Sequence, residues 1–197
     1  MTRLIILNLI LILLTSCSGK DKKEVYNPKA IELNNKAVLQ MQKFNNDSAL
    51  ILFDKAIELD KTYYLPNSSK AAIFILRKEY DKALVESEEA IKIKPDFAEG
   101  WTFAGMIHDK LGNTETAMEY YKKSVELFDK KIADPVMKTK VFTNRLNRAF
   151  SLILLGQESE AKDEMKKLKE EKPDDKTIDE ILKLSKQDYM NQMFKNE

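Results

Sequence analysis

Side chains that could carry out chemistry are few in this 197-residue chain, and they do not cluster. Its one histidine, His108, is followed by Asp109, but adjacent residues of a helix do not face each other, so the pair is not placed for proton transfer. No second histidine completes a triad, no Cys/His cluster could hold zinc, and no glycine-rich loop could hold a phosphate. We therefore predict that His108 packs inside the structure, that no metal site or catalytic residue is present, and that the chain is not an enzyme.

Carboxylates are plentiful but lie in charge-rich stretches, for example at Glu86, Glu88 and Glu89 and at Asp174 and Asp175. We interpret these stretches as solvated helix faces and turns. Because a pair of carboxylates can cleave glycans, a cell-wall hydrolase or an accessory subunit of one is the alternative function. The formal net charge is +1 and no basic block is present, which argues against nucleic acid as a partner. No small-molecule substrate is expected.

The one cysteine, Cys17, directly follows an apolar segment. That segment runs from Leu4 to Leu14 and is interrupted only by Asn8. It is too short for the roughly 20 residues of a membrane-spanning helix and suits the apolar region of a secretory signal, so residues 1–16 are predicted to be a signal peptide. A single cysteine cannot form an internal disulfide in the oxidising compartment that export implies, and an unpaired thiol there would be a liability.

The residues Leu14, Thr15, Ser16 and Cys17 resemble the lipobox of bacterial lipoproteins. The resemblance implies that the signal is cleaved before Cys17 and that this cysteine carries a covalent lipid, with no other cofactor. The mature chain would then be exported and lipid-anchored to a bacterial membrane, at the outer membrane facing the periplasm or the cell surface. Residues 17–27 are predicted to form the lipidated start and a flexible tether. An ordinary signal peptide with an incidental cysteine, or a transmembrane anchor, are the alternatives.

A repeat of 34 residues runs through the rest of the chain. The pattern is an alanine, then an aromatic or small residue four positions on, then an alanine or another small residue three positions further. It occurs three times at this spacing, as Ala49, Phe53 and Ala56, as Ala83, Ser87 and Ala90, and as Ala117, Tyr121 and Ser124. A fourth copy, Ala161, Met165 and Leu168, follows after 44 residues, so ten extra residues precede it. Five glycines and five prolines against 33% charged residues favour helices.

The third copy resembles the tetratricopeptide repeat (TPR) family at Trp101, Ala104, Gly105, Leu111, Gly112, Ala117, Tyr121 and Ser124. The resemblance implies an all-α TPR helical-hairpin solenoid, in which small residues let the two helices of each hairpin approach closely. The predicted TPR domain spans 28–197, with repeats at about 30–63, 64–97, 98–131 and 142–175, an insertion at 132–141 and a capping helix at about 177–194.

End signals refine these boundaries. Asn27 with Pro28, and Asp134 with Pro135, each supply a cap and a first-turn proline. A helix from Pro135 to Leu155 would be about two turns longer than its counterparts and would protrude from the array. The segment Thr177–Glu180 fits a capping box for a final helix that covers the last repeat.

The resemblance also implies a concave groove lined by the first helix of each repeat, where partner segments bind. The predicted groove residues are Asn34, Val38, Met41, Ser68, Ala72, Ile75, Thr102, Met106 and Asp109. This lining suits adaptable apolar contacts, although Met41 and Met106 could equally fill gaps between hairpins. TPR domains that clamp a chaperone's carboxylates place basic residues and asparagine where this chain has Val38, Ser69, Glu99 and Phe103, so no such clamp is expected.

The predicted function is therefore a membrane-anchored interaction scaffold or adaptor of the bacterial cell envelope. Its partners would be other envelope proteins, not yet identified, which bind in the groove. A structural tether that contacts peptidoglycan directly is a further alternative.

Overall fold

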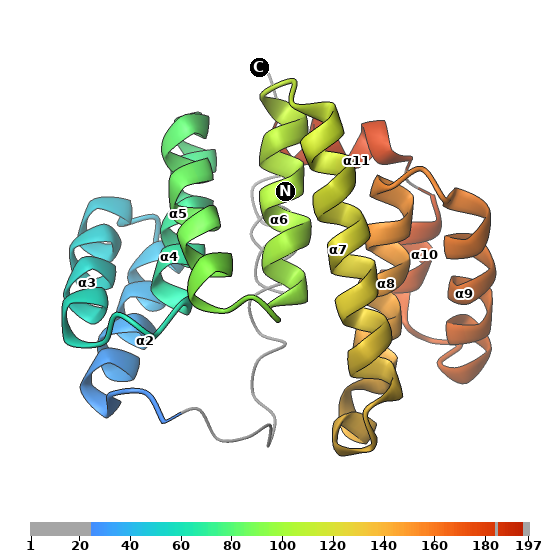
Figure 1. Ribbon diagram of the computed structural model, residues 1–197, viewed down its shortest axis with the longest axis horizontal. Helices are drawn as coiled ribbons and strands as arrows, with labels where there is room; N and C mark the ends of the chain where they lie inside the picture. Colours follow the sequence, from blue (N-terminus) through green and yellow to red (C-terminus); the bar gives the residue numbers. More distant parts are fainter. Residues whose placement is uncertain (1–24, 184, 195–197) are drawn as a thin grey trace. The chain divides into compact units, whose positions relative to one another are not determined.

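The computed structural model describes residues 25–183 and 185–194. All regular structure in this part of the chain is helical, which confirms the all-α class (Figure 1). The elements are α2 (Pro28–Gln42), α3 (Asn46–Leu59), α4 (Leu65–Leu76), α5 (Tyr80–Ile93), α6 (Ala98–Lys110), α7 (Thr114–Ala133), the 3₁₀ helix η1 (Pro135–Lys140), α8 (Val141–Leu154), α9 (Glu158–Glu171), α10 (Lys176–Leu182) and α11 (Lys186–Met193).

The predicted signal peptide, residues 1–16, and Cys17 lie outside the described residues. In the part of the chain that is described, no helix combines the length and the apolar character needed to span a membrane. The end of the predicted tether is described, and it is packed. Tyr26 stacks on Tyr63 with ring centroids 4.6 Å apart, and the Asn27 backbone N–H donates to Asp60 at 2.7 Å. The tether therefore ends before Tyr26, because this ring belongs to an apolar cluster of the first repeat.

The described helices form two compact units, divided in the sequence between Asp96 and Phe97. The first unit holds α2–α5 and the second holds α6–α11. This division lies within one residue of the boundary predicted between the second and third repeats, at 97/98. Each unit holds two of the four predicted hairpins, and the second also holds α10 and α11. A single array over 28–197 stays a prediction.

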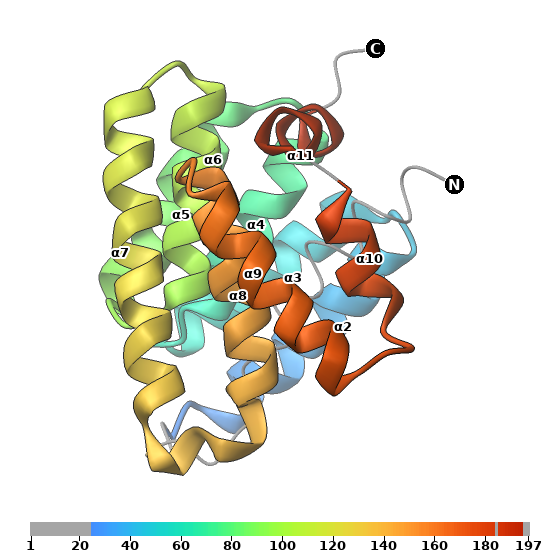
Figure 2. The ribbon, with the colours of Figure 1, turned by 90° about the vertical axis from the view of Figure 1, so that its right-hand side faces the viewer.

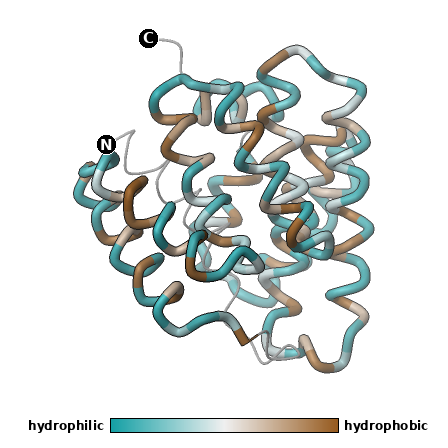
Figure 3. The backbone as a smooth tube through the Cα atoms, turned by 60° about the vertical axis from the view of Figure 1, so that its left-hand side comes forward, coloured by the Kyte–Doolittle hydropathy of each residue, from teal (hydrophilic) through white to brown (hydrophobic). Residues whose placement is uncertain are grey.

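In the first unit, α2 packs against α3, α4 against α5, and α3 also against α4. The residues of the 34-residue pattern are buried on the second helix of each hairpin. Phe53 is fully buried and lies in an apolar cluster with Ala37, Met41, Ala49 and Ile73. Figure 3 shows apolar residues returning along the helices of the molecule, as expected for helices buried on one face.

In the second unit, the helices α6, α7, α8 and α9 pack in chain order, each against the next. The α6–α7 hairpin is close because Gly105 has no side chain: a Cβ there would lie 2.7 Å from a ring carbon of Tyr121. Arg148 of α8 joins its neighbours on both sides, with ion pairs to Asp129 of α7 at 2.5 Å and to Glu160 of α9 at 2.8 Å.

All four hairpins turn in the same way. The residue after the cap of each first helix has a positive φ, at Phe44, Lys78, Gly112 and Gly156. In each turn the next backbone N–H donates five residues back, as from Asn45 to the carbonyl of Gln40 at 2.9 Å. This is the Schellman pattern, which satisfies the last carbonyls of a helix.

Both predicted proline starts are confirmed. The Lys29 N–H donates to the side chain of Asn27 at 2.9 Å, and the Val136 N–H donates to that of Asp134 at 2.8 Å. The helix predicted from Pro135 to Leu155 is wrong, however. Residues 135–140 form η1, and α8 begins only at Val141.

The extra length lies instead in α7, whose 20 residues exceed the 14 of α8. Figure 2 shows α7 and α8 side by side, joined by η1 at their lower ends. The ten inserted residues therefore extend the second helix of the third repeat and build the turn that follows it. Residues of η1 are exposed or half-buried, so no core contact extends it into an α-helix.

The predicted capping helix at 177–194 is two helices, α10 and α11. The Thr177 capping box is also wrong, because Asp175 caps α10 by accepting the Thr177 N–H at 2.9 Å. A capping box does occur at α11, where Ser185 and Asp188 exchange hydrogen bonds. This second cap starts a new helix in the middle of the predicted one and lets the chain change direction.

Candidate functional site

The predicted groove residues of the first unit lie on α2 and α4 and are mostly buried. Val38 is half-buried, and the others are almost without exposed surface: Asn34, Met41, Ser68, Ala72 and Ile75. Met41 belongs to the apolar cluster around Phe53, which is the packing role that the sequence allowed for it. Whether a partner contacts these residues stays a prediction.

Polar contacts join α4 to both neighbouring helices, α3 and α5, in the first unit. Lys70 of α4 bridges Asp54 of α3 at 2.8 Å and Glu86 of α5 at 2.6 Å. Burial lowers the pKa of Lys70, but the hydrogen bonds and charges of the two carboxylates outweigh burial and raise this pKa above its ordinary value. The Asn67 side-chain N–H₂ also donates to Glu86, at 3.0 Å. Lys70 is therefore held as a cation between three helices, which fixes α4 in the unit.

In the second unit, Thr102 lies inside a buried cluster of three hydroxyl groups. Its Oγ1 is 2.7 Å from Ser124 Oγ of α7 and 2.9 Å from Ser151 Oγ of α8. Ser124 also donates to the Ala98 carbonyl at 2.9 Å, and Ser151 to the Asn147 carbonyl at 3.1 Å. Thr102, predicted to line the groove, thus joins three helices. This cluster was not predicted from the sequence, where hydroxyl side chains at packing positions are the signal that indicates it.

Met106 is buried on α6, whereas Asp109 lies near the helix end and gathers polar contacts. The Tyr121 hydroxyl donates to Asp109 at 3.2 Å, and Lys186 of α11 forms an ion pair with Asp109 at 2.6 Å. Burial, and then the charge of Asp109, raise the pKa of Tyr121, so this hydroxyl stays protonated and donates. Asp109, like Thr102, is thus a predicted groove residue that contacts other helices of the second unit, here α7 and α11.

The residues at the carboxylate-clamp positions are buried or half-buried. Glu99 is 2% exposed and forms an ion pair with Lys131 of α7 at 3.0 Å. Phe103 is buried on the same helix, Ser69 is buried on α4, and Val38 is half-buried on α2. None of these four side chains offers a positive charge to a peptide carboxylate.

His108 is buried, and its ring meets that of Tyr120 edge-on at 4.9 Å, while its Nδ1 lies 3.4 Å from the Asn113 amide nitrogen. The prediction that His108 packs is confirmed. Among the described residues, no group of three histidine, cysteine or acidic side chains is placed to hold a metal ion.

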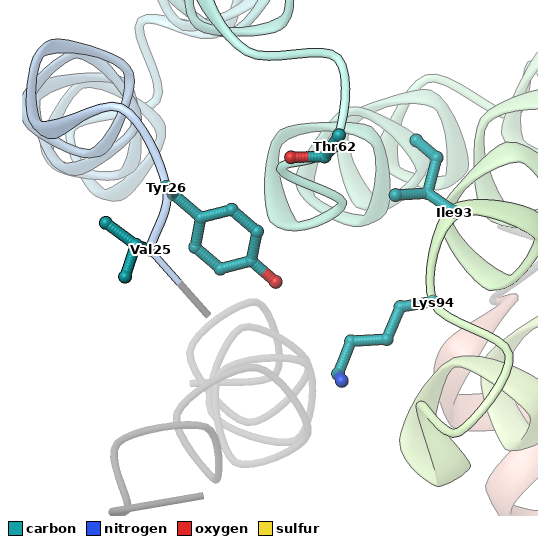
Figure 4. A pocket seen from close by; sticks show the side chains of 5 residues that line it. All are labelled: Val25, Tyr26, Thr62, Ile93 and Lys94. Carbon is teal, nitrogen blue, oxygen red and sulfur yellow. The ribbon is translucent and has the colours of Figure 1, made fainter. Parts of the chain in front are cut away.

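A small hollow lies in the first unit between Tyr26 and the end of α5 (Figure 4). Val25, Tyr26, Thr62, Ile93 and Lys94 line about 270 Å³ of space. Lys94 forms an ion pair with Asp96 at 2.9 Å, and its ammonium lies 5.8 Å from the ring centre of Tyr64. Among the described residues that line the hollow, none is a carboxylate, histidine or cysteine.

Residues 98–130, which span α6 and most of α7, match the family model described as a tetratricopeptide repeat. The chain is 36% identical over 85 residues to the heat shock protein STI1 of Saccharomyces cerevisiae. This match covers 41% of the chain and 14% of STI1, so the chain spans only a small part of that relative's length.

Two solved structures share the fold. The Sgt2 TPR domain from Aspergillus fumigatus has a TM-score of 0.50 at 20% identity, covering 62% of this chain and 80% of that domain. The first TPR of Spaghetti (RPAP3), bound to the HSP90 peptide SRMEEVD, has a TM-score of 0.50 at 16% identity, covering 62% and 94%. The predicted TPR helical-repeat fold is thereby confirmed.

Proposed function

We propose that this chain, which has the tetratricopeptide helical-repeat fold, is a protein-interaction adaptor held to a bacterial membrane by a lipid on Cys17. The observation that carries the adaptor role is the α6–α7 hairpin, which matches the repeat model over residues 98–130 and has the geometry of that repeat. The first TPR of Spaghetti holds a peptide of HSP90, which supports peptide binding as the use of such a fold. Helical hairpins offer first-helix faces to extended or helical segments.

The class of partner follows from the clamp positions. Glu99 adds a negative charge, paired with Lys131, at a position where a carboxylate-binding TPR domain has a basic residue. Lys131 already neutralises this buried charge, so the position offers no free cation to a peptide that ends in acidic residues, and its binding is not favoured there. The partner is therefore a segment with apolar side chains and no acidic terminus, supplied by another protein of the envelope.

The anchor rests on the sequence from Leu14 to Cys17. Two or three acyl chains, at about 0.8 kcal/mol per buried methylene, would hold the chain at the membrane for its lifetime. A Cys17→Ala variant expressed in a bacterial host should keep its signal peptide uncleaved and lose a metabolic lipid label. A variant that kept the label would contradict the anchor and leave the adaptor role unaffected.

The adaptor role is tested by crosslinking the lipidated chain in cells and identifying the captured envelope protein by mass spectrometry. Val38→Lys places a charge on the half-buried groove position of α2, and the matched control Leu39→Lys changes the neighbouring side chain, which is 53% exposed. We expect Val38→Lys to reduce capture of one specific protein at least tenfold, a loss of about 1.4 kcal/mol in binding. Leu39→Lys should retain capture, and circular dichroism should show equal helix content in both variants.

Three results would count against this function. Equal capture by the two variants would remove the groove from the interaction. Release of muropeptides by the purified mature protein would favour the cell-wall hydrolase. Sedimentation with peptidoglycan sacculi in the absence of other proteins would favour the structural tether. The peptide SRMEEVD serves as a negative probe, and measurable binding would contradict the inferred partner class.

A further inference from the structure

The last described helix, α11, presents one face to the rest of the second unit. Lys186, Tyr189 and Met193 lie at positions i, i+3 and i+7 and therefore share one side of the helix. Tyr189 and Met193 are buried, as is Phe194 directly after the helix. An amphipathic helix that lies in a groove is anchored by this spacing. The chain itself thus contains a short helix of the kind that helix-binding grooves hold.

The contacts of this face reach two different first helices of the array. Lys186 pairs with Asp109 of α6 at 2.6 Å, and its ammonium lies 5.3 Å from the ring centre of Tyr121. The Tyr189 ring meets Phe150 of α8 edge-on, with centroids 4.8 Å apart. An aromatic pair of this geometry contributes beyond the area it buries, and a cation over a ring adds to it.

Asp109 and Phe150 stand at equivalent sides of their repeats. Asp109 is a predicted groove residue. Phe150 follows Met106, another predicted groove residue, by 44 residues, which is one repeat plus the ten inserted residues. Figures 1 and 2 show α11 lying crosswise to α6 and α8, as a ligand of the first-helix face would. The final helix predicted to cap the array end therefore lies, in its second half, on the groove side.

We infer that α11 is an internal occupant of the groove of the second unit. The site takes a short amphipathic helix with a lysine at i, an aromatic residue at i+3 and an apolar residue at i+7. A partner segment of this chemistry competes with α11, so binding requires that α11 leave. This inference rests on the proposed function for its outside partner, but the seating of α11 stands on the described contacts alone.

The length of α11 makes this exchange feasible. An isolated helix of eight residues is not stable in water, so α11 owes its helical state to its contacts and to the Ser185–Asp188 capping box. The hydrogen bonds from Ser185 keep the pKa of Asp188 below its ordinary value, so the cap carries its charge at neutral pH. Only Lys183 to Ser185 separate α10 from α11, which keeps the helix at an effective concentration on the order of millimolar. A partner must therefore bind more tightly than a weak internal ligand.

Hydrogen exchange of the full chain tests the seating of α11. Lys186→Glu and Tyr189→Ala should each speed exchange of the amides of residues 186–193 at least about tenfold, while the amides of α7 and α9 stay protected. The matched controls are Lys166→Glu, on the exposed side of α9, and Asn191→Ala, on the exposed side of α11. The exchanged pair Asp109→Lys with Lys186→Glu should recover part of the protection. Unchanged exchange in Lys186→Glu and Tyr189→Ala would overturn the inference.

A synthetic peptide with the sequence of residues 183–197 tests the groove in trans. It should bind the full-length Tyr189→Ala variant at least about tenfold more tightly than the wild-type chain, because the internal occupant then competes less. Equal affinity for both chains would overturn the inference. If the exchange experiments release α11 as expected but crosslinking captures no envelope protein, the proposed function would be contradicted. The seating of α11 on α6 and α8 would still stand.

Discussion

The hairpin turns of the first unit carry side chains where those of the second unit carry glycine. Phe44 and Lys78 have φ values of 62° and 61°, and Gly112 and Gly156 share a φ of 86°. A left-handed conformation costs a residue with a side chain roughly 1–2 kcal/mol and costs glycine almost nothing. The same hydrogen bonds close all four turns, so the repeat geometry is imposed on the first unit against local preference. Packing of the hairpins determines the turn there, whereas local preference and packing agree in the second unit.

Inside the hairpins the distribution of glycine has a different cost, because glycine there allows close packing and does not relieve a strained turn. In the first unit, Ala37 and Ala71 hold a side chain at the close approach of the two helices. In the second unit, the α8–α9 hairpin also has an alanine there, Ala149, but the α6–α7 hairpin has Gly105, because the ring of Tyr121 fills the space in which a Cβ would lie. One unit thus bears its strain in the turns, and the other depends on a glycine inside the hairpin.

The largest effect should come from the core of the first unit. Phe53→Ala removes a fully buried ring and should lower the free energy of unfolding by about 3–5 kcal/mol. Because the cluster around Phe53 lies within the first unit, hydrogen exchange should accelerate in α2–α5 more than in α6–α9. Phe44→Ala, which changes a 54% exposed phenylalanine of the same hairpin, is the control. If hydrogen exchange accelerated equally in α2–α5 and α6–α9, the two units would not unfold separately.

The next effect tests the glycine in the second unit. Gly105→Ala should destabilise the α6–α7 hairpin by about 1–3 kcal/mol, because the new Cβ overlaps the Tyr121 ring. Combining it with Tyr121→Ser, which copies the pairing of Ala71 with Ser87, should make the two changes less than additive. Urea denaturation of the four chains measures this coupling. Full additivity would mean that the ring and the glycine do not restrict each other.

Exchange of the turn residues should have smaller effects of opposite sign. Lys78→Gly should stabilise the first unit by about 0.5–1 kcal/mol, since relief of the positive φ exceeds the added entropy of the unfolded chain. Gly112→Lys should destabilise the second unit by about 1–2 kcal/mol. Thermal unfolding measures both variants. Destabilisation by Lys78→Gly would show that this lysine makes contacts that outweigh its backbone strain.

The smallest effect concerns acid. Hydrogen bonds from Thr62, and then from the Asn27 backbone, lower the pKa of Asp60 in the folded chain. Stability from this group is therefore complete above its unfolded pKa of about 3.9 and is lost as pH falls through the lower folded value. The first unit should lose less stability below pH 4 in Asp60→Asn than in the wild-type chain. Urea midpoints at pH 6 and pH 3 measure the difference, and equal pH dependence would remove Asp60 from the acid response.

The 34-residue period was enough to predict the hairpins. The small residues that let the two helices of a hairpin pack closely recur at this spacing, and they identify the buried face of each second helix. Local caps were predictable where the cap is a short-range hydrogen bond, as at Asn27 and Asp134. Prediction failed where two local signals compete. Asp175 and Thr177 could both start a helix, and Asp175 does so two residues earlier.

The contacts of α11 could not be predicted from the sequence. Tyr189 and Met193 are four residues apart and so share one face of a helix, but nothing local indicates that this face meets Phe150, which lies 39 residues before Tyr189. The direction of α11 is set where the new helix starts, at Ser185. The sequence of a capping box shows that a helix begins there but not the angle between that helix and the one before it. The groove lining was predicted by residue position alone, and position does not distinguish a side chain that faces a partner from one that joins two helices, as Thr102 does.

The cluster of Thr102, Ser124 and Ser151 has a consequence for assembly of the repeats. Homologous hairpins can dock in the wrong order, since each offers a similar apolar face. Docked on the α4–α5 hairpin instead, Ser151 would meet Ser68 and Ala90, which stand 34 residues before Thr102 and Ser124, and would lose the Ser124 hydroxyl. Ser151 would keep its hydrogen bond to the Asn147 carbonyl and lose one hydroxyl neighbour, which costs about 0.5–1.5 kcal/mol. The three hydroxyl groups thus distinguish the correct contact between these hairpins from similar apolar contacts. They make a domain-swapped array, or one with hairpins docked in the wrong order, less stable than the native one.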